Sequence, residues 1–171
     1  MEGKHVIIAF VLALSFWGSA ALCAQEKETD TNEVPSPVEV AKRQRELDEV
    51  KQIANRAALS ALTGDEKFIL RESYWNGNLA PGKAKLIQVQ LFRRNEYKFW
   101  FAAPERDAKL ALNIYDSEGQ IMEAATSQIE DKTNVVTLEF EPELTGTYYL
   151  RIALKTTSER PQDWAVIYAY R

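Results

Sequence analysis

The feature that most constrains the fold is an alternation of apolar and polar residues with a period of two, which starts after Gly64. Such alternation indicates half-buried strands, because successive side chains of a strand point to opposite faces. It predicts seven strands, over residues 86–91, 97–101, 110–115, 121–126, 135–140, 147–154 and 164–170. Short strands at near-regular spacing over about a hundred residues predict an antiparallel β-sandwich of jelly-roll or Greek-key type, at residues 64–171.

The alternation also assigns a face to each side chain. The aliphatic-rich set of each strand, such as Leu110, Leu112 and Ile114, is expected to face the core. Flat aromatic rings outside the core, beside polar side chains, are typical of surfaces that bind sugars or proteins. The candidate ligand- or partner-binding residues are Trp75, in a predicted loop, and Trp100, Tyr115 and Tyr149, at outward strand positions.

One local motif predicts a structural feature. Leu144, Gly146 and Tyr148 have the Leu-x-Gly-x-Tyr spacing of a tyrosine corner. In such a corner the tyrosine hydroxyl bonds a backbone group upstream and stabilises a Greek-key crossover. We therefore expect these three residues to be structural.

Three segments carry a resemblance to a known family. They are Asn-Glu-Tyr-Lys-Phe at 95–99, Leu-Ala-Leu-Asn-Ile-Tyr-Asp-Ser-Glu-Gly at 110–119 and Thr-Gly-Thr-Tyr-Tyr-Leu-Arg-Ile at 145–152. Together they resemble the bacterial pre-peptidase C-terminal domain, although Asn95 stands near the family's first glycine position. The resemblance implies a jelly-roll sandwich on an exported protein, usually as an accessory to a peptidase, although no protease domain precedes the sandwich in this sequence. Some relatives bind calcium, but this sequence has no matching acidic cluster, so we expect neither a metal nor another cofactor.

The first residues have the layout of a secretory signal peptide. A charged start is followed by an apolar run at 6–17 and by small residues up to Ala24, so residues 1–24 are expected to be removed. The run of about a dozen residues is too short for a membrane-spanning helix, which needs about 20. Lipoprotein cleavage before Cys23 is the alternative, but Leu22 occupies the position where that signal has a small residue.

Removal of this segment restricts the possible chemistry. The one histidine, His5, and the one cysteine, Cys23, both lie inside it. The mature chain would then lack the residues for a Ser-His-Asp triad, a thiol centre, a His or Cys zinc site or an internal disulfide. Glycoside hydrolysis by paired carboxylates would remain possible.

A polar segment and a helix are expected before the sandwich. Residues 25–37 are polar and end in two prolines, which is typical of a disordered linker. Residues 38–63 carry an apolar stripe with helical spacing, listed from its start as Val40, Leu47, Val50, Ala54, Ala57 and Ala61. This stripe is rich in alanine, so the helix needs a surface to pack on. It either covers outward aromatic rings of its own domain or docks on a partner.

These observations predict a protein that is not an enzyme. The expected function is an exported, periplasmic or extracellular module that binds a protein or glycan partner in an accessory or adhesion-type role. The alternatives are an envelope assembly protein that docks through the helix and, third, a carboxylate-based hydrolase. A net charge of −4 with mixed signs argues against a nucleic-acid partner, and no transmembrane segment is expected after processing.

The predicted processing can be tested on the exported protein. Cleavage after Ala21 or Ala24 predicts a mature chain that begins at Leu22 or Gln25, because small residues precede both bonds. Intact-mass measurement distinguishes these products. A diacylglyceryl-modified Cys23 at the N-terminus would contradict the prediction.

Overall fold

The computed structural model describes residues 36–65, 67–71, 74–129 and 132–171. The signal peptide expected at 1–24 and most of the linker expected at 25–37 lie outside these residues. Within them the chain forms one helix, α1 (Pro37–Thr63), and nine strands: β1 (Ile69–Leu70), β2 (Trp75–Leu79), β3 (Ala84–Leu91), β4 (Tyr97–Ala102), β5 (Lys109–Tyr115), β6 (Ala125–Ile129), β7 (Lys132–Phe140), β8 (Gly146–Lys155) and β9 (Gln162–Tyr170).

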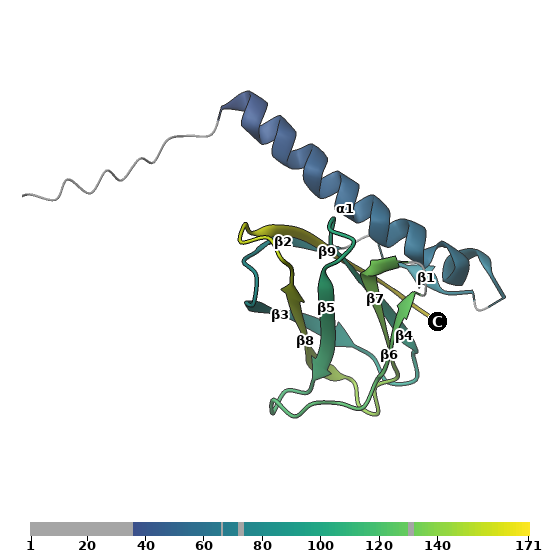
Figure 1. Ribbon diagram of the computed structural model, residues 1–171. Coiled ribbons are helices and arrows are strands. Elements are labelled where there is room, and N and C mark those ends of the chain that lie inside the picture. The colour runs from purple at the N-terminus through teal and green to yellow at the C-terminus, as the bar shows by residue number, and fades with distance from the viewer. Residues whose placement is uncertain (1–35, 66, 72–73, 130–131) are drawn as a thin grey trace, which may run out of the picture. The chain divides into compact units, whose positions relative to one another are not determined.

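The strands form two antiparallel sheets that pack face to face (Figure 1). Sheet A has the order β1-β9-β4-β7-β6, and β2 also pairs with β9 beside β1. Sheet B has the order β3-β8-β5. From β2 to β5 the chain changes sheet at every connection, so strands that are neighbours in sequence lie in different layers. The prediction of an antiparallel β-sandwich preceded by one helix is confirmed.

Three strands differ from the sequence prediction, and the first of them, the two-residue strand β1 that pairs with β9, was not predicted. The loop expected around Trp75 is strand β2, which pairs with β9 along its whole length. Its Asn-Gly-Asn centre has low strand propensity, and tertiary pairing overrides that preference. The strand expected at 121–126 begins later, at Ala125, and Ile121 makes only an isolated bridge with Tyr115.

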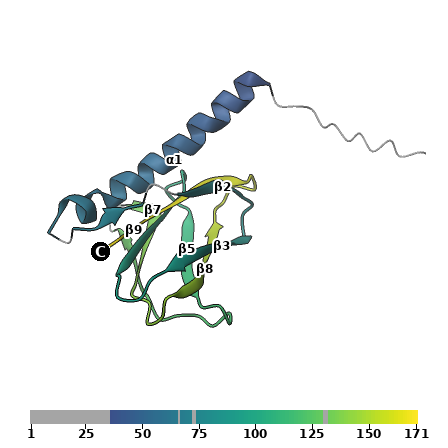
Figure 2. The same cartoon turned by 180° about the vertical axis from the view of Figure 1, so that it is seen from behind.

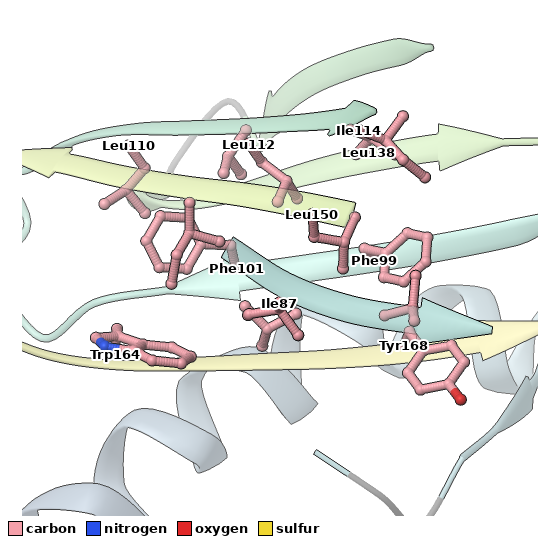
Figure 3. Packing of buried hydrophobic residues seen from close by; sticks show 14 of the residues in the cluster. Ile87, Phe99, Phe101, Leu110, Leu112, Ile114, Leu138, Leu150, Trp164 and Tyr168 are labelled. Carbon is pink, nitrogen blue, oxygen red and sulfur yellow. The ribbon is translucent and has the colours of Figure 1, made fainter. Parts of the chain in front are cut away.

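The main core lies between the two sheets. It contains the inward residues that the alternation predicted, including Phe99, Leu112 and Leu150, each exposed by no more than 1%. In Figure 3, Ile87 of β3 lies between Trp164 and Tyr168 of β9. The assignment of inward faces is therefore confirmed.

Helix α1 begins with a capping box. The Glu39 backbone N–H donates to the Ser36 hydroxyl, and the Ser36 backbone N–H donates to the Glu39 carboxylate. The hydrogen bond from the Ser36 backbone, followed by one from the Ser36 side chain, lowers the pKa of Glu39, because both stabilise the charged carboxylate. Ser36 and Pro37 therefore belong to the start of the helix, which corrects the predicted boundary at residue 38.

The second half of α1 covers the outer face of sheet A (Figures 1 and 2). The buried helix residues are Val50, Ala54, Ala57, Ala58 and Ala61. They pack on sheet residues that are also mostly small, with Trp100 as the large exception. Small side chains on both surfaces allow the helix to approach the sheet closely. Val40, which the stripe placed on the same face, is 52% exposed, because the first half of the helix extends beyond the sheet.

Arg43 anchors the extending part of the helix. Its guanidinium pairs with the Asp163 carboxylate at the start of β9, and the Asn78 amide of β2 donates to the same carboxylate at 3.2 Å.

No helix in the described part of the chain is long and apolar enough to span a membrane.

The tyrosine corner is present at the crossing from β7 to β8. The Tyr148 hydroxyl donates to the Leu144 carbonyl oxygen at 2.9 Å, and the ring is buried against Phe140. Gly146, which lies between Leu144 and Tyr148 in the sequence, is the first residue of β8. This hydrogen bond confirms the structural role predicted for Tyr148 and Leu144.

The corner hydrogen bond and the core predict different losses of stability. Tyr148→Phe removes one hydrogen bond and should lower the free energy of unfolding by about 1 kcal/mol. Leu112→Ala leaves a cavity between the sheets and should cost about 2 to 5 kcal/mol. Chemical denaturation of both variants measures the two values. A neutral Leu112→Ala would contradict the assignment of faces.

Candidate functional site

Tyr115 and Tyr149 lie side by side on the outer face of sheet B. They are direct cross-strand partners of β5 and β8, and Gln88 of β3 lies on the other side of Tyr149. Both rings are partly exposed. None of the outward residues of the three strands is buried, so no described element covers this surface. We call the outward surface around this pair the tyrosine face.

Trp100 does not belong to this surface. It lies on the outer face of sheet A, where α1 buries it to 1% exposure. Two packed sheets have outer faces on opposite sides of the sandwich, and alternation alone does not tell which sheet a strand joins. Trp100 therefore does not share a surface with Tyr115 and Tyr149, and its burial matches the alternative in which the helix covers an outward aromatic ring of its own domain.

Trp75 lies at a third place, the open edge between the two sheets. It is partly buried against the main core, and its ring stacks on Tyr168 with centroids 5.4 Å apart. Among the described residues, β2 pairs only with β9, and β3 only with β8. These two strands form the edges that face each other across the sandwich.

This edge contains a hollow of about 400 Å³, which we call the tryptophan hollow. It is lined by Tyr74, Trp75, Asn76, Lys85, Leu86, Ile87, Gln88 and Trp164. Lys85 places its ammonium group 5.4 Å from the Trp164 ring centroid. Gly77 faces the same indole, and a Cβ atom there would lie 3.2 Å from Trp164 Cζ2. The absence of a side chain at Gly77 therefore leaves room for the indole.

Trp164 carries an unusual polar group. Its Nε1 is buried and has no hydrogen-bond partner in the described structure. Buried donors normally have a partner, and an unsatisfied one costs about 1 to 3 kcal/mol. The alternation of residues predicts only a strand around Trp164, because the signal for this site is the pairing of Gly77 with Trp164 across two strands that are distant in sequence.

A second hollow, of about 160 Å³, lies on the other side of Tyr168, and we call it the arginine hollow. It is lined by Arg71, Gln90, Phe92, Asn95, Tyr97, Tyr168 and Tyr170. Hydrogen bonding to Tyr168, followed by Coulombic attraction, raises the pKa of Arg71, so the guanidinium stays charged. The Tyr97 hydroxyl accepts from the Phe92 backbone N–H at 2.9 Å, which stabilises the rim.

Several carboxylates form local structural contacts. Asp116 accepts from the backbone N–H groups of Glu118 and Gln120 and so shapes the turn after β5. Thr156 donates to Glu105, and Lys98 pairs with Glu139. Within the described residues, no group of three or more His, Cys, Asp or Glu side chains is arranged to hold a metal.

Comparison with known proteins assigns no family. No family model matches the chain, and no curated protein matches it. Among solved structures, a match is the propeptide form of the lipase BlEst2 from Bacillus licheniformis, at 8% identity and a TM-score of 0.37. The match covers 70% of this chain and 27% of the lipase chain. At this TM-score the likeness carries no argument.

The burial of Trp100 separates it from the tyrosine face. Trp100→Ala should destabilise the domain by about 3 to 5 kcal/mol, because it removes a large buried side chain between α1 and sheet A. Tyr149→Ala should change stability by only about 0.5 kcal/mol, as surface substitutions usually do. Thermal and denaturant unfolding measure both. Equal losses for the two variants would contradict the placement of α1.

Proposed function

We propose that the chain is an exported, non-catalytic module that binds a protein or glycan partner in an accessory or adhesion-type role. The observation that carries this proposal is the tyrosine face. Its two adjacent rings lie on the outer surface of sheet B, which no described element covers, whereas α1 covers the opposite side.

The surroundings of the rings favour a binding role. Gln88, Asn113 and Arg151 are outward neighbours of Tyr115 and Tyr149 in the registers of the three strands. Aromatic rings contribute contact area at low cost in side-chain entropy, and amide and guanidinium groups supply directed hydrogen bonds. Such a flat surface suits a ligand that lies across strands.

The alternative role in assembly has one supporting observation. In the first half of α1, Val38 and Val40 are 78% and 52% exposed. Exposed valines at the start of a helix supply part of an apolar docking surface. The second half of the same helix is already used by its own domain, which makes assembly through α1 the second candidate.

The export that we propose depends on the layout of residues 1–24, and the non-catalytic role depends on the loss of His5 and Cys23 with them. The contacts of Asp116 with the turn after β5 and of Glu105 with Thr156 further support the proposal, because carboxylates that hold local structure are less available for carboxylate-based hydrolysis. The resemblance to the pre-peptidase C-terminal domain agrees with an accessory role and remains a prediction.

The double variant Tyr115→Ala/Tyr149→Ala tests the proposal. Wild type and variant are applied to arrays of defined glycans and of defined peptides and folded protein domains, and both are melted in parallel. We expect wild-type signals that fall by at least tenfold in the variant, while each substitution changes stability by only about 0.5 kcal/mol. Ala111→Ser, on the same face but away from the rings, is the matched control. Wild-type binding that the double variant retains in full would contradict a role for the tyrosine face.

A further inference from the structure

Strand β3 forms an exposed edge of sheet B and carries few of the features that normally prevent an edge strand from pairing with another chain. β3 pairs only with β8 among the described residues, and its central segment, residues 86–91, reads Leu-Ile-Gln-Val-Gln-Leu. This segment has no charge, proline or glycine, and Leu86 is 60% exposed. Natural proteins normally block such edges with charges, proline or bulges, because an open edge pairs with other chains. Lys85 gives this protection only at the beginning of the strand.

The facing edge of the other sheet offers a less suitable template. β2 is five residues long and has Asn76, Gly77 and Asn78 at its centre. These residue types have low strand propensity. A strand that joins this side of the sandwich would therefore pair with β3 and continue sheet B.

The two hollows lie where side chains of an added strand would point inward. The tryptophan hollow is lined on β3 by residues 85–88, and the arginine hollow by Gln90 and the following Phe92. The centres of these two stretches are about four and a half residues apart, which is about 15 Å along a strand. Residues i and i+4 of a strand point to the same face. One extended chain thus reaches both hollows with two side chains.

The two hollows differ in chemistry. The tryptophan hollow is lined by the side chains of Trp75 and Trp164, and it suits an aromatic or large apolar side chain. The arginine hollow presents the charged Arg71 guanidinium with the amides of Gln90 and Asn95, and it suits a carboxylate, which pairs well with a guanidinium. Lys85 adds a second positive charge at the tryptophan hollow.

We propose that β3 binds an extended peptide by strand addition, with an aromatic or large apolar residue in the tryptophan hollow and an aspartate or glutamate four residues away in the arginine hollow. Main-chain hydrogen bonds to the β3 edge supply affinity, and the two hollows supply specificity. This site is separate from the tyrosine face and goes beyond the function proposed above.

The first test selects the ligand. A phage-displayed library of random linear twelve-residue peptides is selected on the purified protein, and the enriched peptides are synthesised for calorimetry. We expect enriched sequences to share an aromatic or large apolar residue four positions from an acidic one. Selected peptides without this spacing, or no selected peptide at all, would overturn the proposal. A dimer in sedimentation, with β3 amides protected from hydrogen exchange before peptide is added, would also overturn it.

The second test examines the main-chain contacts. Each backbone amide of a selected peptide is methylated in turn, which removes one hydrogen-bond donor without changing a side chain. Strand addition predicts that alternate positions lose at least tenfold in affinity while the positions between them do not, because only every second amide of an edge strand points to its neighbour. Equal tolerance at all positions would overturn strand addition.

The third test examines Arg71. Wild type should bind the acidic peptide at least tenfold more tightly than the peptide with Glu→Gln or Asp→Asn, and Arg71→Gln should remove this preference. Arg106→Gln, at an exposed arginine in the turn before β5, is the control and should keep it. Tyr115→Ala/Tyr149→Ala should bind the peptide as wild type does, so failure at the tyrosine face and failure at β3 are distinguishable. A preference that survives in Arg71→Gln would overturn the assignment of the arginine hollow.

Discussion

The contact between the alanine stripe of α1 and the outer face of sheet A determines the asymmetry of the whole molecule. An alanine-rich helix of this kind has little reason to persist alone in water, and most helical stability in proteins comes from packing of one face. Here Ala54, Ala58 and Ala61 pack on a sheet that also presents alanines, with Trp100 filling the space between them. The contact stabilises the helix and removes the apolar side of sheet A from solvent.

This asymmetry leaves the two proposed binding surfaces on the other side of the sandwich and at one edge. A β-sandwich without a covering helix exposes the outer faces of both sheets to solvent. Here α1 covers the outer face of sheet A, so only the outer face of sheet B remains exposed. The tyrosine face and the β3 edge meet at Gln88, whose strand belongs to both. A ligand held at the edge and one held on the face would therefore be close neighbours, although different side chains recognise them.

The sequence allowed the inward faces to be predicted but not the grouping of outward residues. Phe99 and Leu112 were assigned correctly because strand geometry alone imposes a period of two. Trp100 and Tyr149 were grouped together wrongly, because their separation depends on which sheet each strand joins, and that is a property of long-range pairing. For the same reason β2 and the tryptophan hollow could not be predicted from local patterns. Gly77 contacts Trp164 only after residues about 90 positions apart have paired.

The position of β9 has a consequence for how this chain acquires its structure as it emerges from a ribosome or a translocation channel. β9 lies at the heart of sheet A, where it pairs with β1, β2 and β4. Until residues 162–170 have emerged, β1 and β2 have no strand to pair with. Helix α1 then also lacks the part of its packing surface that β9 supplies. The topology thus delays the completion of sheet A until residues 162–170 are available, because the strands that precede them lack their central partner before then.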